Sequence, residues 1–144
     1  MRSWLILALI MLATPAAAQT PAQKAQLARV MYSAFTCSTY ASMSGNNKEQ
    51  ERLFQLGLKA GRDFLKAFES REIPTDAMQT EVPIGVSLYL AGPTHDFIIG
   101  RIFEAVQTTA YKEVAKDALP RDDGDLSKMR ARNAFTAANC SLIK

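Results

Sequence analysis

The sequence predicts an all-α protein, a compact bundle of about five helices in which one disulfide joins the first helix to the last. Apolar residues recur at helical spacing in several segments, whereas no two segments form a pair of candidate strands. The two cysteines lie far apart, near the two ends of the predicted helical region. With 144 residues, 48% of them hydrophobic, the chain can build one modest core. We therefore expect residues 19–144 to form a single helical domain.

Residues 1–18 have the features of a secretory signal peptide. Arg2 precedes the apolar run Trp4 to Ala13, and small residues lead to a predicted cleavage after Ala18. The mature chain would keep 16 Lys and Arg against 14 Asp and Glu, so its net charge is close to neutral and does not indicate nucleic-acid binding. No later segment approaches about 20 apolar residues, so we expect no stable membrane span. The predicted location is periplasmic or secreted.

The first two predicted helices cover residues 22–44 and 47–70. The first has apolar positions on one side, a mostly small and polar far face, and Gly45 as its stop. The second has a capping-box start, with Asn47 followed three residues later by Gln50. Gly57 and Gly61 lie four residues apart on its apolar side, which predicts close approach of a neighbouring helix.

Two short elements are expected between residues 75 and 90. Thr75 or Asp76 can cap a short helix that runs to about residue 80. Residues 84–90 are apolar nearly all round and fit a buried strand or a central helix. We predict the central helix, because a lone strand would leave its backbone edge unsatisfied.

The most periodic segment is the predicted helix over residues 93–116, with Gly92 as its cap and Pro93 at its first position. Asp96 lies in its first turn, where it is either an acid at the end of the core or a buried acid paired with Arg62 of the second helix. Gly100 predicts close helix packing. An apolar stripe follows one face of this helix: Ile99, Ile102, Phe103, Val106, Ala110 and Val114.

Two polar features accompany that helix. Arg101 and Glu104 are spaced for an i, i+3 ion pair. His95 is the only histidine and has no Cys or His at metal-ligand spacing, so neither a metal nor a catalytic role is expected for it. The acidic loop of Asp122, Asp123 and Asp125 lacks the frame of a calcium site and is predicted to be solvated.

The last predicted helix covers residues 126–140 and places Cys140 on the stripe of Leu126 and Met129. Cys37 lies on the core side of the first helix. Because exported compartments favour disulfides, we expect Cys37 and Cys140 to be joined. The alternative of free thiols or a nucleophile has no second histidine or Cys-x-x-Cys spacing to support it.

The segment that starts the 93–116 helix also carries a family resemblance. Its pattern, Gly-Pro-x-x-Asp-Phe-x-x-Gly-Arg-x-x-Glu, uses Gly92, Pro93, Asp96, Phe97, Gly100, Arg101 and Glu104. It resembles a segment of an uncharacterised family of small exported all-helical proteins of Gram-negative bacteria. Gly61, Arg62, Phe64 and the two cysteines add weaker support. The resemblance implies a helical fold and export, and it carries no activity.

Two kinds of function remain open. The first is a non-enzymatic binding module of the cell envelope, such as an inhibitor or immunity-type protein, that recognises another envelope protein. Its candidate surface anchors are Tyr32, Tyr40 and Phe135, which could instead cover the edges of a small core. The second is a small-ligand or catalytic pocket around Asp96, Arg62, His95 and Arg101. No catalytic motif occurs, no cofactor is expected, and the oligomeric state stays open.

Overall fold

The computed structural model describes residues 18–116 and 124–144. The predicted signal peptide therefore lies almost wholly outside the described residues, as do Asp122 and Asp123 of the acidic loop. Within the described ranges the fold is all-α, as predicted, and contains no strand. Its elements are α1 (Pro21–Met43), α2 (Asn47–Glu69), α3 (Thr75–Glu81), α4 (Ile84–Ser87), α5 (His95–Ala115), α6 (Gly124–Ala137) and the 3-10 turn η1 (Cys140–Leu142).

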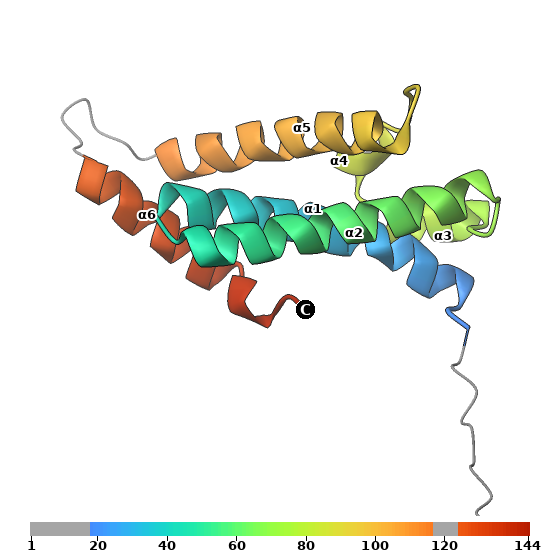
Figure 1. Cartoon of the computed structure of the whole chain (residues 1–144), viewed down its shortest axis with the longest axis horizontal. Helices are drawn as coiled ribbons and strands as arrows, with labels where there is room; N and C mark the ends of the chain where they lie inside the picture. The colour runs from blue at the N-terminus through green and yellow to red at the C-terminus, as the bar shows by residue number, and fades with distance from the viewer. Residues whose placement is uncertain (1–17, 117–123) are drawn as a thin grey trace, which may run out of the picture.

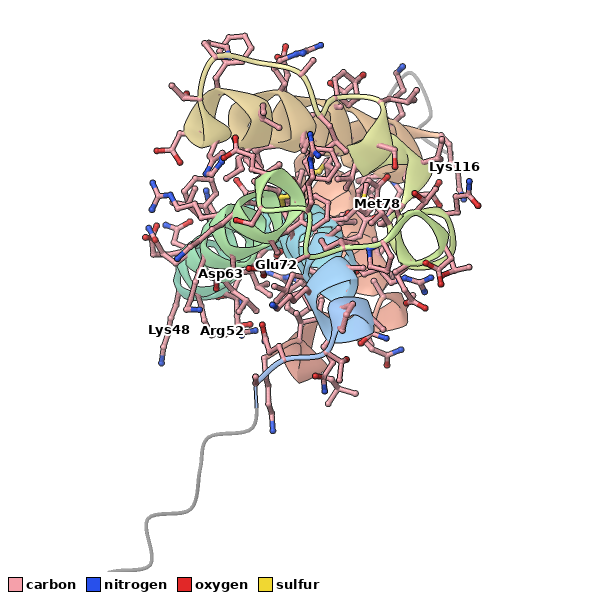
Figure 2. The ribbon with its side chains drawn as sticks, turned by 90° about the vertical axis from the view of Figure 1, so that its right-hand side faces the viewer. Lys48, Arg52, Asp63, Glu72, Met78 and Lys116 are labelled. Carbon is pink, nitrogen blue, oxygen red and sulfur yellow. A yellow bond between two sulfur atoms is a disulfide. The ribbon has the colours of Figure 1, made fainter. Side chains whose placement is uncertain are left out.

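The helices surround α1. Figure 1 shows α1 and α2 as an antiparallel pair, with α5 lying along them and α6 set at an angle across one end. Figure 2 looks along the bundle and shows α3 and α4 on one side, whereas Lys48 and Arg52 of α2 lie on the other. Because α1 contacts α2, α3, α5 and α6, it is the central helix of the fold.

The C-terminal half of α1 is buried nearly all round, which corrects the expectation of a small, polar far face. Phe35, Thr39 and Tyr40 are all buried. The Thr39 hydroxyl donates to the Phe35 carbonyl at 3.0 Å, and the Ser38 hydroxyl donates to the Gln50 carbonyl at 2.9 Å. Since the hydroxyls are satisfied internally, α2 can cover one side of α1 while α5 and α6 cover the other.

Two of the three glycine predictions are confirmed and one is wrong. A Cβ on Gly57 would lie 2.6 Å from the Phe35 ring, and one on Gly61 would lie 2.6 Å from the Met31 sulfur. Both glycines let α1 come close to α2. At Gly100 nothing lies within 4 Å of such a Cβ, because this residue is exposed on α5.

The helix starts differ slightly from the predictions. Asn46, and not Asn47, caps α2 by accepting a hydrogen bond from the Glu49 backbone N–H. Thr94 caps α5, so the helix begins two residues after Pro93. Pro74 precedes α3 without a side-chain cap, in place of the expected Thr75 or Asp76. For α2 and α5, the helix starts where a side-chain oxygen accepts a hydrogen bond from a backbone N–H of the first turn.

The segment predicted as a central helix is a single exposed turn. α4 has four residues, and only Val86 among them is buried. Ile84 and Leu88 are 75% and 70% exposed. The prolines and glycines that bracket residues 84–90 stop the helix before it can pass through the core.

The disulfide between Cys37 and Cys140 is confirmed, with 5.5 Å between the two Cα atoms. Cys140 lies in η1 rather than in the last helix. Helix α6 ends at Ala137, and Asn139 in the left-handed conformation turns the chain back toward α1. The predicted stripe of Leu126 and Met129 is consequently exposed.

Candidate functional site

The predicted polar cluster of Arg62, His95, Asp96, Arg101 and Glu104 is divided between two places. Arg62, His95 and Asp96 lie where α2 ends and α5 begins, around an open hollow of about 540 Å³. Arg101 and Glu104 line a separate groove of about 520 Å³ beside α4. The two places therefore have to be judged separately.

Arg62 and Asp96 form the predicted pair, but on the surface. The guanidinium donates from Nε to Oδ1 at 2.8 Å and from Nη2 to Oδ2 at 2.9 Å. The two side chains are 51% and 62% exposed, so the expectation of a buried acid is wrong. Hydrogen bonds from Arg62 hold the pKa of the Asp96 carboxyl below its ordinary value. The pair links α2 to α5 across solvent, where ion pairs contribute little.

This pair gives a pH-dependent prediction. The lowered pKa means that ionised Asp96 stabilises the fold above the ordinary carboxyl pKa of about 4, and that this contribution is lost as the pH falls through the folded value. Asp96→Asn should lower the melting temperature at pH 7 by no more than about 4 °C, and the difference should be smaller at about pH 2, where more of Asp96 is protonated. Thermal melts followed by circular dichroism at both pH values test this. An Asp96→Asn variant that is unfolded at pH 7 would contradict it.

Most of the other charges around the hollow near Asp96 are paired, whereas Lys66, which also lines it, forms no ion pair with a described residue. His95 Nε2 lies 2.8 Å from Glu69 Oε2, and Lys59 pairs with Asp63 at 2.7 Å. Among the described residues no group of three or more His, Cys, Asp or Glu side chains could hold a metal ion. The hollow therefore offers a ligand no concentrated charge and little enclosure.

Arg101 does not pair with Glu104 as the spacing predicted. Its Nη1 donates to the Ala91 carbonyl at 2.8 Å. Its guanidinium carbon lies 5.2 Å from the centre of the Tyr89 ring and 5.9 Å from that of the Phe97 ring. The connection before α5 folds back over the helix, so the Ala91 carbonyl and two rings hold Arg101 in place of the exposed Glu104 carboxylate.

The groove beside Arg101 runs between α4 and α5. Residues from α1, α4 and α5 line it, together with Leu88 and Tyr89 just after α4: Tyr32, Gly85, Leu88, Tyr89, Arg101, Glu104, Ala105, Val106, Thr108, Thr109 and Lys112. Leu88 forms one edge and is largely exposed. Ile84 lies one turn before Leu88 and lines a second hollow of about 420 Å³ toward α3. The two aliphatic side chains thus stand between two hollows.

The predicted surface anchors have three different environments. Tyr32 is half-buried and lines the groove between α4 and α5. Phe135 is half-buried beside Arg132, in a hollow near the turn from α1 to α2. Tyr40 is 7% exposed, and burial, followed by the charge of Glu113, raises the pKa of its phenol. Tyr40 is therefore a core residue and not an anchor.

The residues that the sequence reading missed are Ile84 and Leu88. A run of apolar residues was interpreted as a core element, whereas the helix that follows Pro83 ends after the four residues Ile84–Ser87. One turn cannot bury every side it presents. Its two residues spaced i, i+4 were the available signal of an exposed apolar face.

No protein-family model matches the sequence, and no curated protein or solved structure shows significant similarity to the chain. Among the described residues, no helix has both the length and the apolar character needed to cross a bilayer. Function is therefore inferred from the residues and their geometry.

Proposed function

We propose that this protein is an exported, non-enzymatic binding module of the cell envelope that recognises another protein, in the manner of an inhibitor or immunity protein. The observation that carries the proposal is the exposure of Ile84 and Leu88 on one side of α4, at 75% and 70%. The recognition face consists of these two residues with the adjoining Tyr32, Tyr89 and Arg101.

Exposed aliphatic side chains on a short helix are unfavourable in water unless a partner covers them. Here they are raised between two hollows, so a partner surface could surround them on both sides. Tyr and Arg are the residue types that most often anchor protein interfaces, and Tyr89 and Arg101 are already held against each other. Little ordering of these two side chains would be needed on binding.

Export is supported by two independent features. The Cys37–Cys140 bond is of the kind that persists in oxidising compartments. The N-terminal residues have the charged, apolar and small-residue order of a secretory signal. A periplasmic or secreted location accounts for both.

The alternative function, a ligand or catalytic pocket around Asp96, has less support. Arg62 engages both carboxylate oxygens of Asp96, and His95 is engaged by Glu69. A reacting group or ligand would have to displace these partners in an open hollow where water competes.

A matched pair of surface variants tests the proposal. The mature protein is used to isolate partners from an envelope extract, and the affinity of the purified partner is measured by calorimetry. Ile84→Ser with Leu88→Ser should weaken binding at least about tenfold, because two exposed anchors are lost without a change in the core. Leu142→Ser is the control, since Leu142 is 71% exposed on η1, outside the recognition face. Equal affinity of the double variant and the wild type would refute the recognition face.

A further inference from the structure

The groove between α4 and α5 has a shape that favours an elongated occupant. On α5 the lining residues recur at helical spacing from Arg101 to Lys112, a distance of about 16 Å along the axis. Between these two long side chains the helix presents Glu104, close to the Arg101 end, and then the small residues Ala105, Thr108 and Thr109. The α5 wall is therefore low along Ala105, Thr108 and Thr109, between the longer side chains of Glu104 and Lys112.

The opposite wall and the floor are apolar and aromatic. Leu88 and Tyr89 form the wall at the end of α4. Tyr32 of α1 passes so close under Gly85 that a Cβ there would lie 2.9 Å from its ring. The middle of the groove thus suits an apolar side chain, which would pack on Tyr32, Leu88 and the small residues of α5.

The charges of the groove are unequal. Arg101 and Lys112 stand at its ends, whereas Glu104 is the one acidic residue among those that line it. The Ala91 carbonyl and the two rings hold the Arg101 guanidinium but leave most of its N–H donors unused. Lys112 forms no ion pair with any described residue. Glu104 disfavours a ligand that is acidic along its whole length.

We infer that the occupant is an acidic segment of a partner protein, with an apolar side chain at its middle and a carboxylate toward each end. The apolar side chain enters the low part of the groove, one carboxylate pairs with Arg101, and the other pairs with Lys112. A helix of about three turns or a shorter extended strand spans the required distance. This inference rests on the proposed function, whose recognition face shares Tyr32, Tyr89, Leu88 and Arg101.

The test uses a displayed library of random peptides of about 16 residues, selected on the immobilised, oxidised mature protein. Enriched peptides are synthesised with a fluorescent label, and their affinities are measured by anisotropy. We expect enriched peptides to carry two carboxylates that flank an apolar residue. Changing those carboxylates to amides should weaken binding at least about tenfold, and added salt should weaken the acidic form more than the amide form.

Variants of the protein locate the contact. Arg101→Gln and Lys112→Gln should each weaken the acidic peptide about tenfold, whereas the matched change Lys48→Gln on α2 should have less than about a twofold effect. Lys112→Gln is the decisive variant, because Arg101 also holds the Ala91 carbonyl and its loss can disturb the local backbone. Figure 2 shows Lys48 on the opposite side of the bundle from α3 and α4.

The outcomes separate this inference from the proposed function. In one outcome, the enriched peptides bind the Ile84→Ser, Leu88→Ser double variant less tightly than the wild type. If such peptides lack carboxylates, or if Lys112→Gln does not change their affinity, the acidic-segment inference is overturned and the recognition face stands. Peptides that respond to neither set of variants overturn both. If no peptide is enriched, the acidic-segment inference fails, while the partner isolated from the envelope extract still decides the proposed function.

Discussion

Replacing Cys37 and Cys140 together by alanine is expected to lower the free energy of unfolding by about 4–5 kcal/mol. The two residues are 103 positions apart, so the bond removes much of the conformational freedom of the unfolded chain. The sulfur atoms also pack in a second apolar cluster with Tyr40, Leu53 and Val114, which would lose contacts. Because small domains are stable by only about 5–15 kcal/mol, the loss would be a large part of the total.

The loss should begin in α6. Ala131 is its one buried residue, with partial help from Ala134 and Phe135, so the disulfide through η1 adds a covalent anchor to a sparsely buried contact with α1. The Arg52 hydrogen bond to the Ile143 carbonyl at 2.8 Å is exposed and cannot replace that anchor. Urea unfolding followed by circular dichroism measures the global effect, and hydrogen exchange measures the opening of α6.

Wild-type protein unfolded with and without a phosphine reductant is the control for the alanine substitutions themselves. Reduced wild type and the double variant should have similar unfolding free energies. A decrease of less than about 1 kcal/mol in both would show that the bond does not restrain the unfolded chain as the loop-entropy model requires.

The sequence predicted those features of the fold that depend on one helix or on covalent chemistry. The stripe on α5 was identified almost completely, because a helix with a single neighbouring layer has one apolar face at regular spacing. The disulfide followed from an even cysteine count with export signals. Gly57 and Gly61 were interpreted correctly, because glycine on the apolar side of a long helix has little other use than close packing.

Features that depend on several neighbours at once could not be predicted in the same way. The buried far side of α1 results from contacts with four other helices. The spacing of apolar residues along α1 does not reveal how many helices will pack against it. Cys140 lies off the last helix because α6 ends at Ala137 and Asn139 adopts a left-handed conformation, and the spacing of apolar residues carried no signal for this end.

The candidate site shows the same division. The Arg62–Asp96 pair was predicted on the premise that a buried Asp96 would need a cation, and the pair forms although both side chains are exposed. The contacts of Arg101 depend on the backbone between α4 and α5, which returns the Ala91 carbonyl and Tyr89 to the side of α5. The course of such an irregular connection cannot be predicted from the sequence, because the segment has no regular spacing of apolar residues.

Gly57→Ala is expected to lower the free energy of unfolding by about 1–3 kcal/mol, even though alanine is the better helix former. The new Cβ would lie 2.6 Å from Cδ1 and Cε1 of Phe35, which is fully buried. The Phe35 ring cannot turn aside easily, because the centres of the Phe54 and Phe103 rings lie 5.9 and 5.0 Å from its own. The helices α1 and α2 would have to separate slightly, at the cost of packing along both.

A graded series of alanine substitutions isolates this effect from helix propensity. At Gly61 the nearest atom is the Met31 sulfur, on a flexible side chain, and the next are Ile99 Cδ1 and Cγ1 at 3.1 Å, so Gly61→Ala should cost less than Gly57→Ala. At Gly100, where the new Cβ meets nothing within 4 Å, alanine should stabilise α5 by about 0.5–1 kcal/mol. Urea unfolding of the three variants should therefore rank them Gly100→Ala, Gly61→Ala and Gly57→Ala in decreasing stability. If Gly57→Ala were as stable as Gly100→Ala, the close contact between α1 and α2 would be wrong, since propensity alone predicts the same gain at both positions.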